Sequence, residues 1–396
     1  MNQYRSTIRG RIRLGAITWV AFLVGLRLLI LQPERCGTVT AQEVRAAALA
    51  TVGWLTVNQA DDGEWLYRYD APAGEDLGGY NITRHAGLTL SLYQAAAEGL
   101  ADALATADRG SSWLSERLVE AGGGVTVDEP GASTVPVGAS ALWAVALAER
   151  RFLTGEDDFD DVLRGLGTFL ASQVEDNGAV AERWDRRDDA PVAGRYSVFY
   201  TGEAYFALAR LERVFPGEGF GPVADRVGHY LATERDDAED RFPPVSDHWA
   251  AYGLAETASW RGLSATEQEY AVRLGEIFGP QIRYASQRTE SWFTHRTRGR
   301  QTLGAGLGTL GEGTTSLWTI TQLEGDVGGL EAAAERSHCV AGLLVERQID
   351  AVEAREFQDP ERVAGAWFQF GVTQMDDQQH TLSALLRTLP ILEAGT

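Results

Sequence analysis

Apolar residues recur at spacings of three and four along almost the whole chain from about residue 42, which is the periodicity of an amphipathic α-helix. The segments AQEVRAAALATVGWLTVNQ, DVLRGLGTFLASQVE and PVADRVGHYLATER show this spacing. Stretches rich in Gly, Pro and Asp, such as ADDGEW and EDNGAVAER, interrupt it and predict turns. No stretch alternates for long enough to predict a substantial sheet, although EWLYRYD fits a short strand within a loop. The pattern predicts an all-α protein.

The helices recur as pairs, in which an amphipathic helix and a polar loop precede a second helix rich in small residues. Each second helix opens with polar residues and continues as an apolar run. The six openings begin at Tyr80, Val135, Phe199, Val245, Leu310 and Gln374. Their separation of about 45–65 residues leaves room for one helical hairpin each. Hairpins that are too small to bury their own apolar faces must stack on their neighbours, so six of them are expected to close into a ring.

Such a ring would gather the polar starts of its inner helices at one end of a central cavity. Helix N-termini carry a partial positive charge, so this end would also attract electron-rich ligand groups. The segments YNITRHAG, YTGEAYFALARL and DHWAAYGLAE resemble segments of bacterial toroid proteins. The chain as a whole resembles the (α/α)6 toroid, or six-hairpin, superfamily, which includes toroid glycoside hydrolases, polysaccharide lyases and epimerases, and terpenoid cyclase-like proteins. The resemblance implies one (α/α)6 toroid domain over residues 42–396.

The N-terminal segment predicts a membrane anchor. An apolar run over residues 14–31, broken only by Arg27, is just long enough to span a bilayer. Four basic residues precede it and favour a cytoplasmic N-terminus: Arg5, Arg9, Arg11 and Arg13. We therefore expect a single transmembrane helix that acts as an uncleaved signal anchor.

This anchor would divide the chain into four parts. Residues 1–13 would form a short basic cytoplasmic tail, 14–31 the transmembrane signal anchor and 32–41 a linker, with residues 42–396 outside the cytoplasm. The alternative is a signal peptide cleaved after Ala41, where TVTA offers the small residues that a peptidase requires. PERC lacks the small residues that precede a lipidated cysteine, so a lipoprotein is not expected.

Charge and composition exclude several classes of function. The formal net charge is −21 and all 35 basic residues are arginine. An excess of acid argues against a nucleic-acid partner, and the absence of lysine excludes Schiff-base lysines and the P-loop lysine. Two cysteines, Cys36 in the linker and Cys339 in an apolar helical run, form neither a disulfide framework nor a metal cluster. A bridge between them is not expected.

The opening YNITRH carries the first group of candidate site residues. Asn81 and His85 lie one turn apart on the same helix face, with Arg84 offset from them. A neutral His85 at this position would serve as a general base, with Tyr80, Asn81 and Arg84 binding the substrate. The alternative is structural, with Asn81 as the helix N-cap and His85 hydrogen-bonded inside the core.

The third and fourth openings add carboxylates and aromatic side chains. Glu203 follows Tyr200 in the first turn of its helix, and burial there would raise the pKa of its carboxyl group. Asp247 precedes His248 and Trp249, and Trp249 would offer a stacking surface for a sugar ring. An acid near a helix N-terminus also stabilises the helix, and Asp247 suits an N-cap, so a structural role stays open for both acids.

The last two openings complete the predicted ring of polar residues. Asp377 and His380 lie on one helix face and Glu312 lies in a glycine-rich entry. No two histidines have the spacing of metal ligands, so we predict neither a metal nor a cofactor; the single DDxxH-like string gives little support to metal–diphosphate chemistry. His295 falls in a loop with Arg296, Arg298 and Arg300 that either binds an anionic group or is simply solvated. His229 and His338 fall within helices and are expected to be structural.

The leading hypothesis is a glycoside hydrolase that acts on an oligo- or polysaccharide. This chemistry needs two carboxyl groups, and Glu203 would act with Asp247 or Asp377. Inverting toroid hydrolases imply a carboxyl separation of about 6.5–9.5 Å. The first alternative is a uronate lyase or C5-epimerase that uses the YNITRH set. The second is a toroid without catalytic activity that binds a glycan or an envelope partner.

Overall fold

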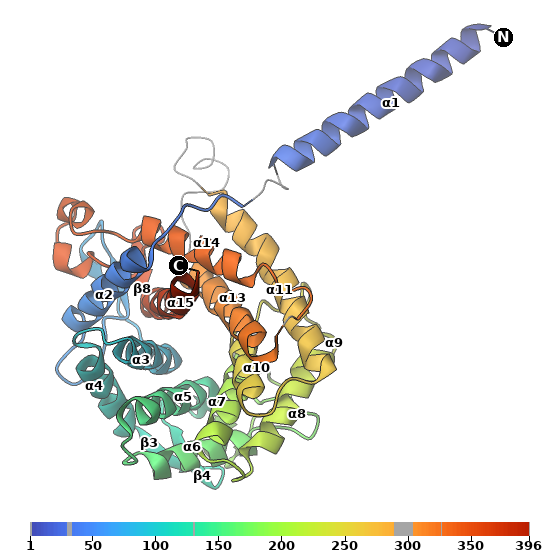
Figure 1. Ribbon diagram of the computed structural model, residues 1–396. Helices are drawn as coiled ribbons and strands as arrows, with labels where there is room; N and C mark the ends of the chain where they lie inside the picture. The colour runs from blue at the N-terminus through green and yellow to red at the C-terminus, as the bar shows by residue number, and fades with distance from the viewer. Residues whose placement is uncertain (1, 30–33, 130, 289–303, 326, 396) are drawn as a thin grey trace.

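The computed structural model describes residues 2–29, 34–129, 131–288, 304–325 and 327–395. Within them, twelve helices form six hairpins arranged as two concentric rings (Figure 1). The outer helices are α2 (Ala41–Val57), α4 (Ala103–Ser115), α6 (Asp160–Ser172), α8 (Phe220–Thr233), α11 (Ala265–Ser286) and α14 (Ala333–Arg347). The inner helices are α3 (Ile82–Ala97), α5 (Val137–Thr154), α7 (Tyr200–Val214), α10 (His248–Trp260), α13 (Gly304–Glu324) and α15 (Met375–Ala394). The predicted six-hairpin toroid is confirmed.

The inner ring is closed. Each inner helix packs against the next, and α15 packs against both α13 and α3. The inner helices are buried around their circumference, and every residue of α5 from 137 to 148 is buried. A helix that is apolar on all sides requires such an environment. The outer helices bury one face only, as in α6, where the buried positions include Leu163, Leu166 and Leu170.

Short strands occupy the loops that enter the inner helices. One sheet has the order β2–β1–β8 and another β5–β6–β7, while β3 and β4 form a hairpin. Their bounds are β1 (Arg68–Asp70), β2 (Glu75–Asp76), β3 (Leu118–Ala121), β4 (Gly124–Val127), β5 (Thr134–Pro136), β6 (Arg183–Asp185), β7 (Ala190–Pro191) and β8 (Val372–Gln374). Strand β1 lies in EWLYRYD, where a short strand was predicted. Its antiparallel pairing with β8, through Arg68 and Gln374 among others, joins the first hairpin to the last.

One predicted helix start is wrong. The fifth inner helix, α13, begins at Gly304 and not at Leu310, so Glu312 lies two turns inside it. The glycine-rich sequence suggested a loop, but these glycines serve helix packing. A Cβ atom on Gly308 would lie 2.5 Å from the backbone of His380, and one on Gly311 would lie 2.7 Å from Ala384. Both distances are too short for a side chain, so glycine is required where α13 crosses α15.

The N-terminal helix α1 (Asn2–Leu29) extends away from the ring (Figure 1). Its apolar side chains between residues 12 and 24 are exposed, with Leu14, Trp19 and Phe22 each more than half accessible. Among the described residues, none of the helices combines the length and the apolar composition that a membrane span requires. The predicted anchor, residues 14–31, ends beyond α1 in residues that lie outside the described ranges. The remaining short helices are α9 (Arg235–Ala238) and the 3-10 turns Glu353–Glu356 and Pro360–Arg362.

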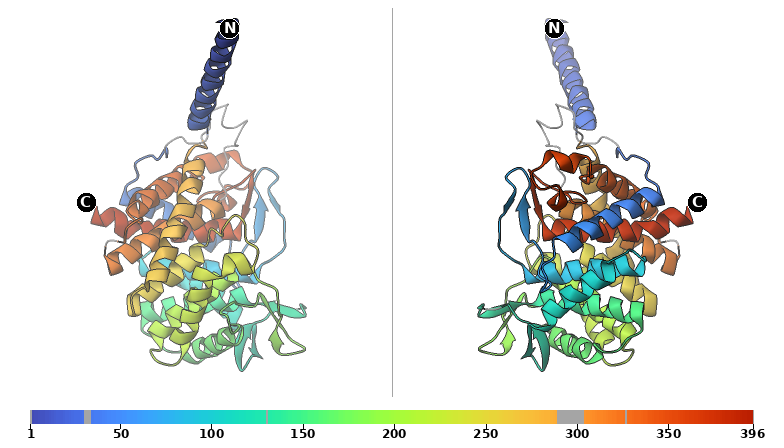
Figure 2. Two further views of the ribbon diagram at one scale, coloured as in Figure 1. Left: turned by 90° about the vertical axis from the view of Figure 1, so that its right-hand side faces the viewer. Right: turned by 90° about the vertical axis from the view of Figure 1, so that its left-hand side faces the viewer.

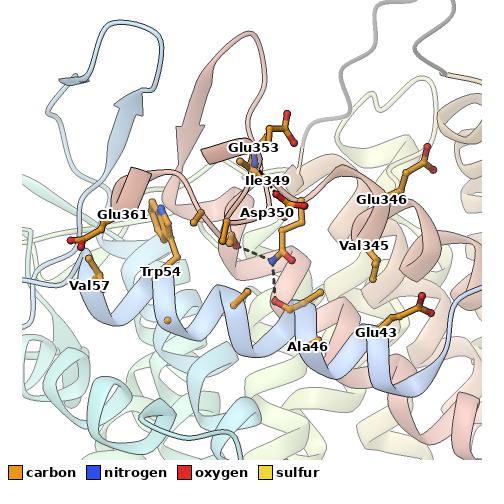
Figure 3. A pocket seen from close by; sticks show the side chains of 17 residues that line it. Glu43, Ala46, Trp54, Val57, Val345, Glu346, Ile349, Asp350, Glu353 and Glu361 are labelled. Carbon is orange, nitrogen blue, oxygen red and sulfur yellow. Dashed lines mark hydrogen bonds between the residues drawn. The ribbon is translucent and has the colours of Figure 1, made fainter. Parts of the chain in front are cut away.

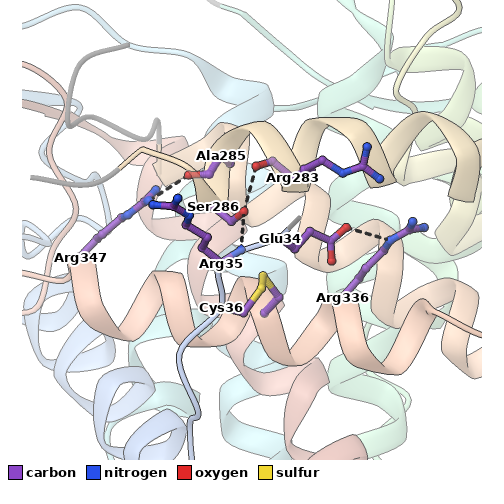
Figure 4. The surroundings of a disulfide bond; sticks show 9 residues. Glu34, Arg35, Cys36, Arg283, Ala285, Ser286, Arg336 and Arg347 are labelled. Atoms are coloured by element: carbon purple, nitrogen blue, oxygen red, sulfur yellow. Dashed lines mark hydrogen bonds and ion pairs between the residues drawn. A yellow bond between two sulfur atoms is a disulfide. The ribbon is translucent and has the colours of Figure 1, made fainter. Parts of the chain in front are cut away.

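A disulfide joins Cys36 to Cys339, which corrects the expectation that these cysteines stay apart (Figure 4). The linker runs across α11 and α14, where the backbone N–H of Arg35 donates to Ser286 Oγ at 3.0 Å. Glu34 also forms an ion pair with Arg336 on α14 at 3.6 Å. Closure of the ring brings together two cysteines that are 303 residues apart, a proximity that local sequence does not reveal.

Replacing either cysteine should lower stability without changing the fold. The bridge restricts the unfolded chain, so Cys339→Ser should lower the free energy of unfolding by about 2–4 kcal/mol. Denaturant unfolding under non-reducing conditions measures this loss. The double variant Cys36→Ser/Cys339→Ser should be no less stable than either single variant. A loss that is equally large when the wild-type protein is already reduced would contradict the explanation.

Candidate active site

A cavity of about 410 Å³ opens at the end of the ring where the inner helices begin, and all six inner helices contribute to its wall. Figure 2 shows most of the short strands at this end and the C-terminus at the other. The lining residues are Asn81, Thr83, Arg84, Leu142, Ser197, Phe199, Tyr200, Glu203, His248, Trp249, Ala305, Gly306, Thr309, Asp376, Gln379 and His380. The prediction that polar helix starts converge on one cavity is confirmed.

A second, larger hollow is a less suitable site. A groove of about 800 Å³ lies outside the ring, along α2 and the end of α14 (Figure 3). Its floor is formed by small and apolar side chains such as Ala46 and Val57. The carboxylates of Glu43, Glu346 and Glu361 point away from one another. Because its polar groups do not converge, this groove is less suited to catalysis than the central cavity.

Glu203 is a buried carboxyl group in the cavity wall. Its Oε2 atom has no hydrogen-bond partner among the described residues, and Gly138 leaves room for it, because a Cβ atom there would lie 2.2 Å from Oε2. Burial, and then the neighbouring Asp247 carboxylate, raise the pKa of Glu203 well above its usual range. The surroundings of Glu203 therefore favour the protonated form of its carboxyl group.

Asp247 does not line the cavity. Its carboxylate caps α10 by accepting a hydrogen bond from the backbone N–H of Ala250 at 2.9 Å, and it accepts another from Arg235 at 2.5 Å. Burial raises the pKa of Asp247, and the Arg235 guanidinium opposes this effect. The structural alternative, an N-cap, describes the position of Asp247, and its charge acts on the cavity residue Glu203.

Of the two adjacent aspartates on α15, Asp376 lines the cavity and Asp377 does not, which is the reverse of our prediction. Asp377 lies outside the cavity and accepts hydrogen bonds from the backbone N–H groups of Gln374 at 3.0 Å and Ala305 at 2.8 Å. Burial raises the pKa of Asp377 to about 7. Asp376 lines the cavity instead, with no partner for its Oδ1 atom among the residues described. Asp377 forms a capping box with Gln374 at the start of α15, but glutamine is not one of the usual N-cap residues, so the sequence did not reveal this structural role.

Arg84 lines the cavity, but its guanidinium group is already hydrogen-bonded and ion-paired to neighbouring side chains. Its guanidinium donates to Tyr67 Oη at 2.6 Å and Gln374 Oε1 at 3.1 Å, and it forms an ion pair with Asp376 at 3.2 Å. Asn81 caps α3 by accepting from the backbone N–H of Arg84 at 3.1 Å, as its structural alternative predicted. Asp376 thus balances the charge of Arg84, and the two side chains form one polar wall.

His85 and Tyr80 do not line the cavity, which corrects the prediction of a catalytic base here. His85 is fully buried against Trp113, and both ring nitrogens are hydrogen-bonded. Nδ1 accepts from Tyr80 Oη at 2.6 Å, and Nε2 donates to the carbonyl oxygen of Gly110 at 2.9 Å. Burial lowers the pKa of His85 to about 3. On a helix a side chain one position from a cavity-facing residue points elsewhere, and His85 faces the outer helix α4 (Ala103–Ser115).

Three inner helices bring His248, Glu312 and His380 together. His380 Nδ1 lies 2.7 Å and His248 Nε2 3.6 Å from Glu312 Oε2. Burial, and then the charge of His380, lower the pKa of His248 well below its usual value. Burial also opposes the charged form of His380, but Glu312 outweighs it and raises the pKa of His380. Both imidazoles line the cavity, whereas Glu312 lies behind them and accepts a hydrogen bond from Tyr252 at 3.3 Å.

Aromatic side chains complete the wall. Trp249 is only 3% exposed and stacks on Tyr252 and Phe206, so it does not present the open stacking surface that was predicted for a sugar ring. Tyr200 lies beside Glu203, and burial raises the pKa of Tyr200 to about 12.

Two further histidines among the described residues lie outside the cavity wall. His229 and His338 lie within the outer helices α8 and α14. His295 and the arginines predicted around it fall outside the described residues.

Comparisons with solved structures identify the architecture. No protein-family profile and no curated protein matches the chain. An α-1,6-mannanase of Salegentibacter, crystallised as an inactive variant with α-1,6-mannotetrose, is 12% identical with a TM-score of 0.60, over 89% of this chain and 100% of that one. The chain has the (α/α)6 toroid fold.

Other toroid proteins also match. A sugar epimerase from a ruminal bacterium is 14% identical with a TM-score of 0.61, over 88% of this chain and 98% of that one. An α-amylase from Clostridium perfringens is 11% identical with a TM-score of 0.54, over 87% and 97%. At these identities the likeness establishes the fold, and the reaction must be argued from the cavity.

Replacing His85 should affect stability and not catalysis. His85→Ala leaves a cavity and unpaired groups on Tyr80 and Gly110, so the free energy of unfolding should fall by about 2–4 kcal/mol. Denaturant unfolding measures this loss. Turnover per folded molecule should stay within a few-fold of wild type, and a loss of turnover at unchanged stability would restore the catalytic assignment.

Glu203 should make stability depend on pH. Its pKa is higher in the folded than in the unfolded state, so its contribution is fully present below the unfolded pKa near 4.5 and is lost as pH rises through the folded pKa. Between these two pKa values, the free energy of unfolding should fall by up to about 1.4 kcal/mol per pH unit. Between pH 5 and pH 8, the free energy of unfolding measured with urea should therefore fall less for Glu203→Gln than for wild type. The control Glu269→Gln, at an exposed position, should match wild type.

Proposed function

We propose that this protein is a carbohydrate-active enzyme, a glycoside hydrolase in which Glu203 and Asp376 act on a sugar in the central cavity. One observation carries the proposal: two carboxyl groups line the same cavity in contrasting surroundings. Burial raises the pKa of Glu203 well above its usual range, whereas Asp376 forms an ion pair with the Arg84 guanidinium. One protonated and one ionised carboxyl group is the pair that glycoside hydrolysis requires.

The reaction divides between these two groups. Glu203 donates its proton to the glycosidic oxygen as the bond from that oxygen to the anomeric carbon breaks. Asp376 accepts a proton from a water molecule whose oxygen bonds to the anomeric carbon, and the hydroxyl group stays on the sugar. Direct attack by water requires the wider separation of the two carboxyl groups, about 6.5–9.5 Å, and inverts the configuration at the anomeric carbon. Both the separation and the inversion stay predictions.

The cavity favours a neutral sugar. Its volume of about 410 Å³ lies in the lower part of the range for small-molecule sites, about 300–1,000 Å³, and suits a short saccharide. Arg84 is neutralised by Asp376, so it does not offer an unpaired cation to a uronate. Tyr80 and His85, which a lyase or C5-epimerase would need, lie outside the wall. These observations disfavour the uronate mechanism.

The domain is proposed to work outside the cytoplasm. Disulfides persist in oxidising compartments, so the Cys36–Cys339 bridge supports this location. The basic residues at the N-terminus and the apolar residues after them support an uncleaved anchor with a cytoplasmic tail.

A sugar epimerase or isomerase is the second candidate. It is favoured by His248 and His380, two imidazoles in the cavity wall with ring centroids 5.0 Å apart. Two such groups could pass a proton between neighbouring carbons of a sugar without breaking a glycosidic bond. A cellobiose 2-epimerase from Bacillus thermoamylovorans and a D-mannose isomerase are among the structures of similar fold.

Product analysis separates these candidates. The full chain is incubated with α- and β-linked gluco- and manno-oligosaccharides and with free mannose and cellobiose. Hydrolysis releases new reducing ends, isomerisation converts one sugar to another at a constant number of molecules, and a lyase forms products that absorb in the ultraviolet. A toroid without catalytic activity leaves every sugar unchanged, and that result would overturn the proposal.

Substitution of the carboxyl groups tests their roles. Glu203→Gln and Asp376→Asn should each lower kcat by about 10²–10⁴-fold, because each removes a proton-transfer group. Asp377→Asn is the matched control, since it alters the adjacent carboxylate outside the cavity, and its kcat should stay within tenfold of wild type. Equal losses in Asp376→Asn and Asp377→Asn would contradict the assignment of Asp376.

A further inference from the structure

We infer that His248, Glu312 and His380 form a binding site for a divalent transition-metal ion such as Zn²⁺. The three side chains come from α10, α13 and α15, and their ligand atoms all lie within 4.8 Å of one another. Two imidazoles and one carboxylate are a ligand set that zinc uses in catalytic sites. The inference does not depend on the proposed hydrolysis.

The spacing of the donors fits such an ion after a small adjustment. Two donors about 2.1 Å from a tetrahedral ion lie about 3.4 Å apart. His248 Nε2 and Glu312 Oε2 are already 3.6 Å apart. His380 Nδ1 is 2.7 Å from the same oxygen, where it makes a hydrogen bond. An ion would replace that hydrogen bond and move the two atoms apart by about 0.7 Å.

His248 gives an independent reason to expect a ligand. It is 2% exposed, and neither ring nitrogen has a hydrogen-bond partner among the described residues. A buried imidazole without partners is costly, because it has lost its water and gained nothing in return. A metal ion bound through Nε2 would satisfy that nitrogen.

The helix packing holds the donors in place. Gly308 allows α13 to approach the backbone of His380, since a Cβ atom there would lie 2.5 Å away. This close approach lets Glu312, one turn further along α13, reach both histidines. Tyr252 donates to Glu312 Oε1 at 3.3 Å and shares a 2.7 Å hydrogen bond with Ser383. Such partners orient a metal-binding carboxylate.

The identity of the donors selects the ion, and their position suggests its effect. Imidazole nitrogens favour zinc, cobalt, nickel and copper over magnesium and calcium, which prefer oxygen ligands. His248 and His380 line the cavity, so the remaining coordination positions would face it. Neighbouring hydroxyl groups of a sugar could fill them. A metal held in this way would also prevent the two histidines from transferring protons.

Metal binding to the full chain, without sugar, provides the test. The protein is freed of metal with a chelator and titrated with Zn²⁺ by calorimetry, and Co²⁺ serves as a visible-absorption probe of the coordination geometry. We expect one equivalent of Zn²⁺ to bind and Mg²⁺ not to bind. His248→Ala, His380→Ala and Glu312→Gln should each raise the Kd of Zn²⁺ by more than about 100-fold. Loss of a residue that only hydrogen-bonds to a metal ligand typically costs about 10–100-fold, so a larger effect indicates loss of a ligand.

Two controls keep the result interpretable. His229→Ala removes an exposed histidine on α8 and should leave the Kd of Zn²⁺ unchanged. Circular dichroism and the thermal midpoint of each variant show whether it folds, and Zn²⁺ should raise that midpoint in wild type but not in His248→Ala. Failure to bind Zn²⁺, or binding that all three site variants retain, would overturn the inference. Neither outcome bears on hydrolysis, which is measured separately with Glu203→Gln.

Discussion

Close packing of α15 against both neighbouring inner helices is the constraint on which the ring depends. Gly87 on α3 faces Gln379, where a Cβ atom would lie 2.4 Å from the side chain, and Gly308 on α13 faces His380. A larger residue at Gly308 would meet the backbone of His380 and push α15 outward, whereas one at Gly87 would meet only the end of the flexible Gln379 side chain. Because α15 also supplies a wall of the cavity, the packing that closes the ring positions the site as well.

Burial gives the acidic residues of the cavity their different properties. The chain carries 56 acidic residues, most of which are solvated and need no further explanation. Glu203 stands apart because the ring removes it from water and places Asp247 behind it. Asp376, on the opposite side of the same cavity, is balanced by Arg84. The contrast arises from the surroundings of the two groups and not from their chemical identity.

The polar residues that the sequence marked as candidates divide into two groups in the structure. Glu203 and His248 face the cavity, whereas His85 and Asp377 face neighbouring helices and satisfy backbone groups. Asp377 was the predicted site residue, but its neighbour Asp376 lines the cavity and Asp377 forms a capping box at the start of α15. Successive residues on a helix point about 100° apart, so a shift of one position turns a cavity residue into a structural one.

The sequence by itself determined the helical hairpins, their number and their approximate limits, because helix periodicity and turn composition are local properties. It also indicated that polar helix starts would meet in one cavity, since six repeats leave few other ways to bury their apolar faces. Only the tertiary structure decided which side chains share that cavity. The contact between Cys36 and Cys339 and the meeting of His248, Glu312 and His380 join distant segments. Such contacts depend on how the helices rotate and how closely they pack, which short-range patterns do not encode.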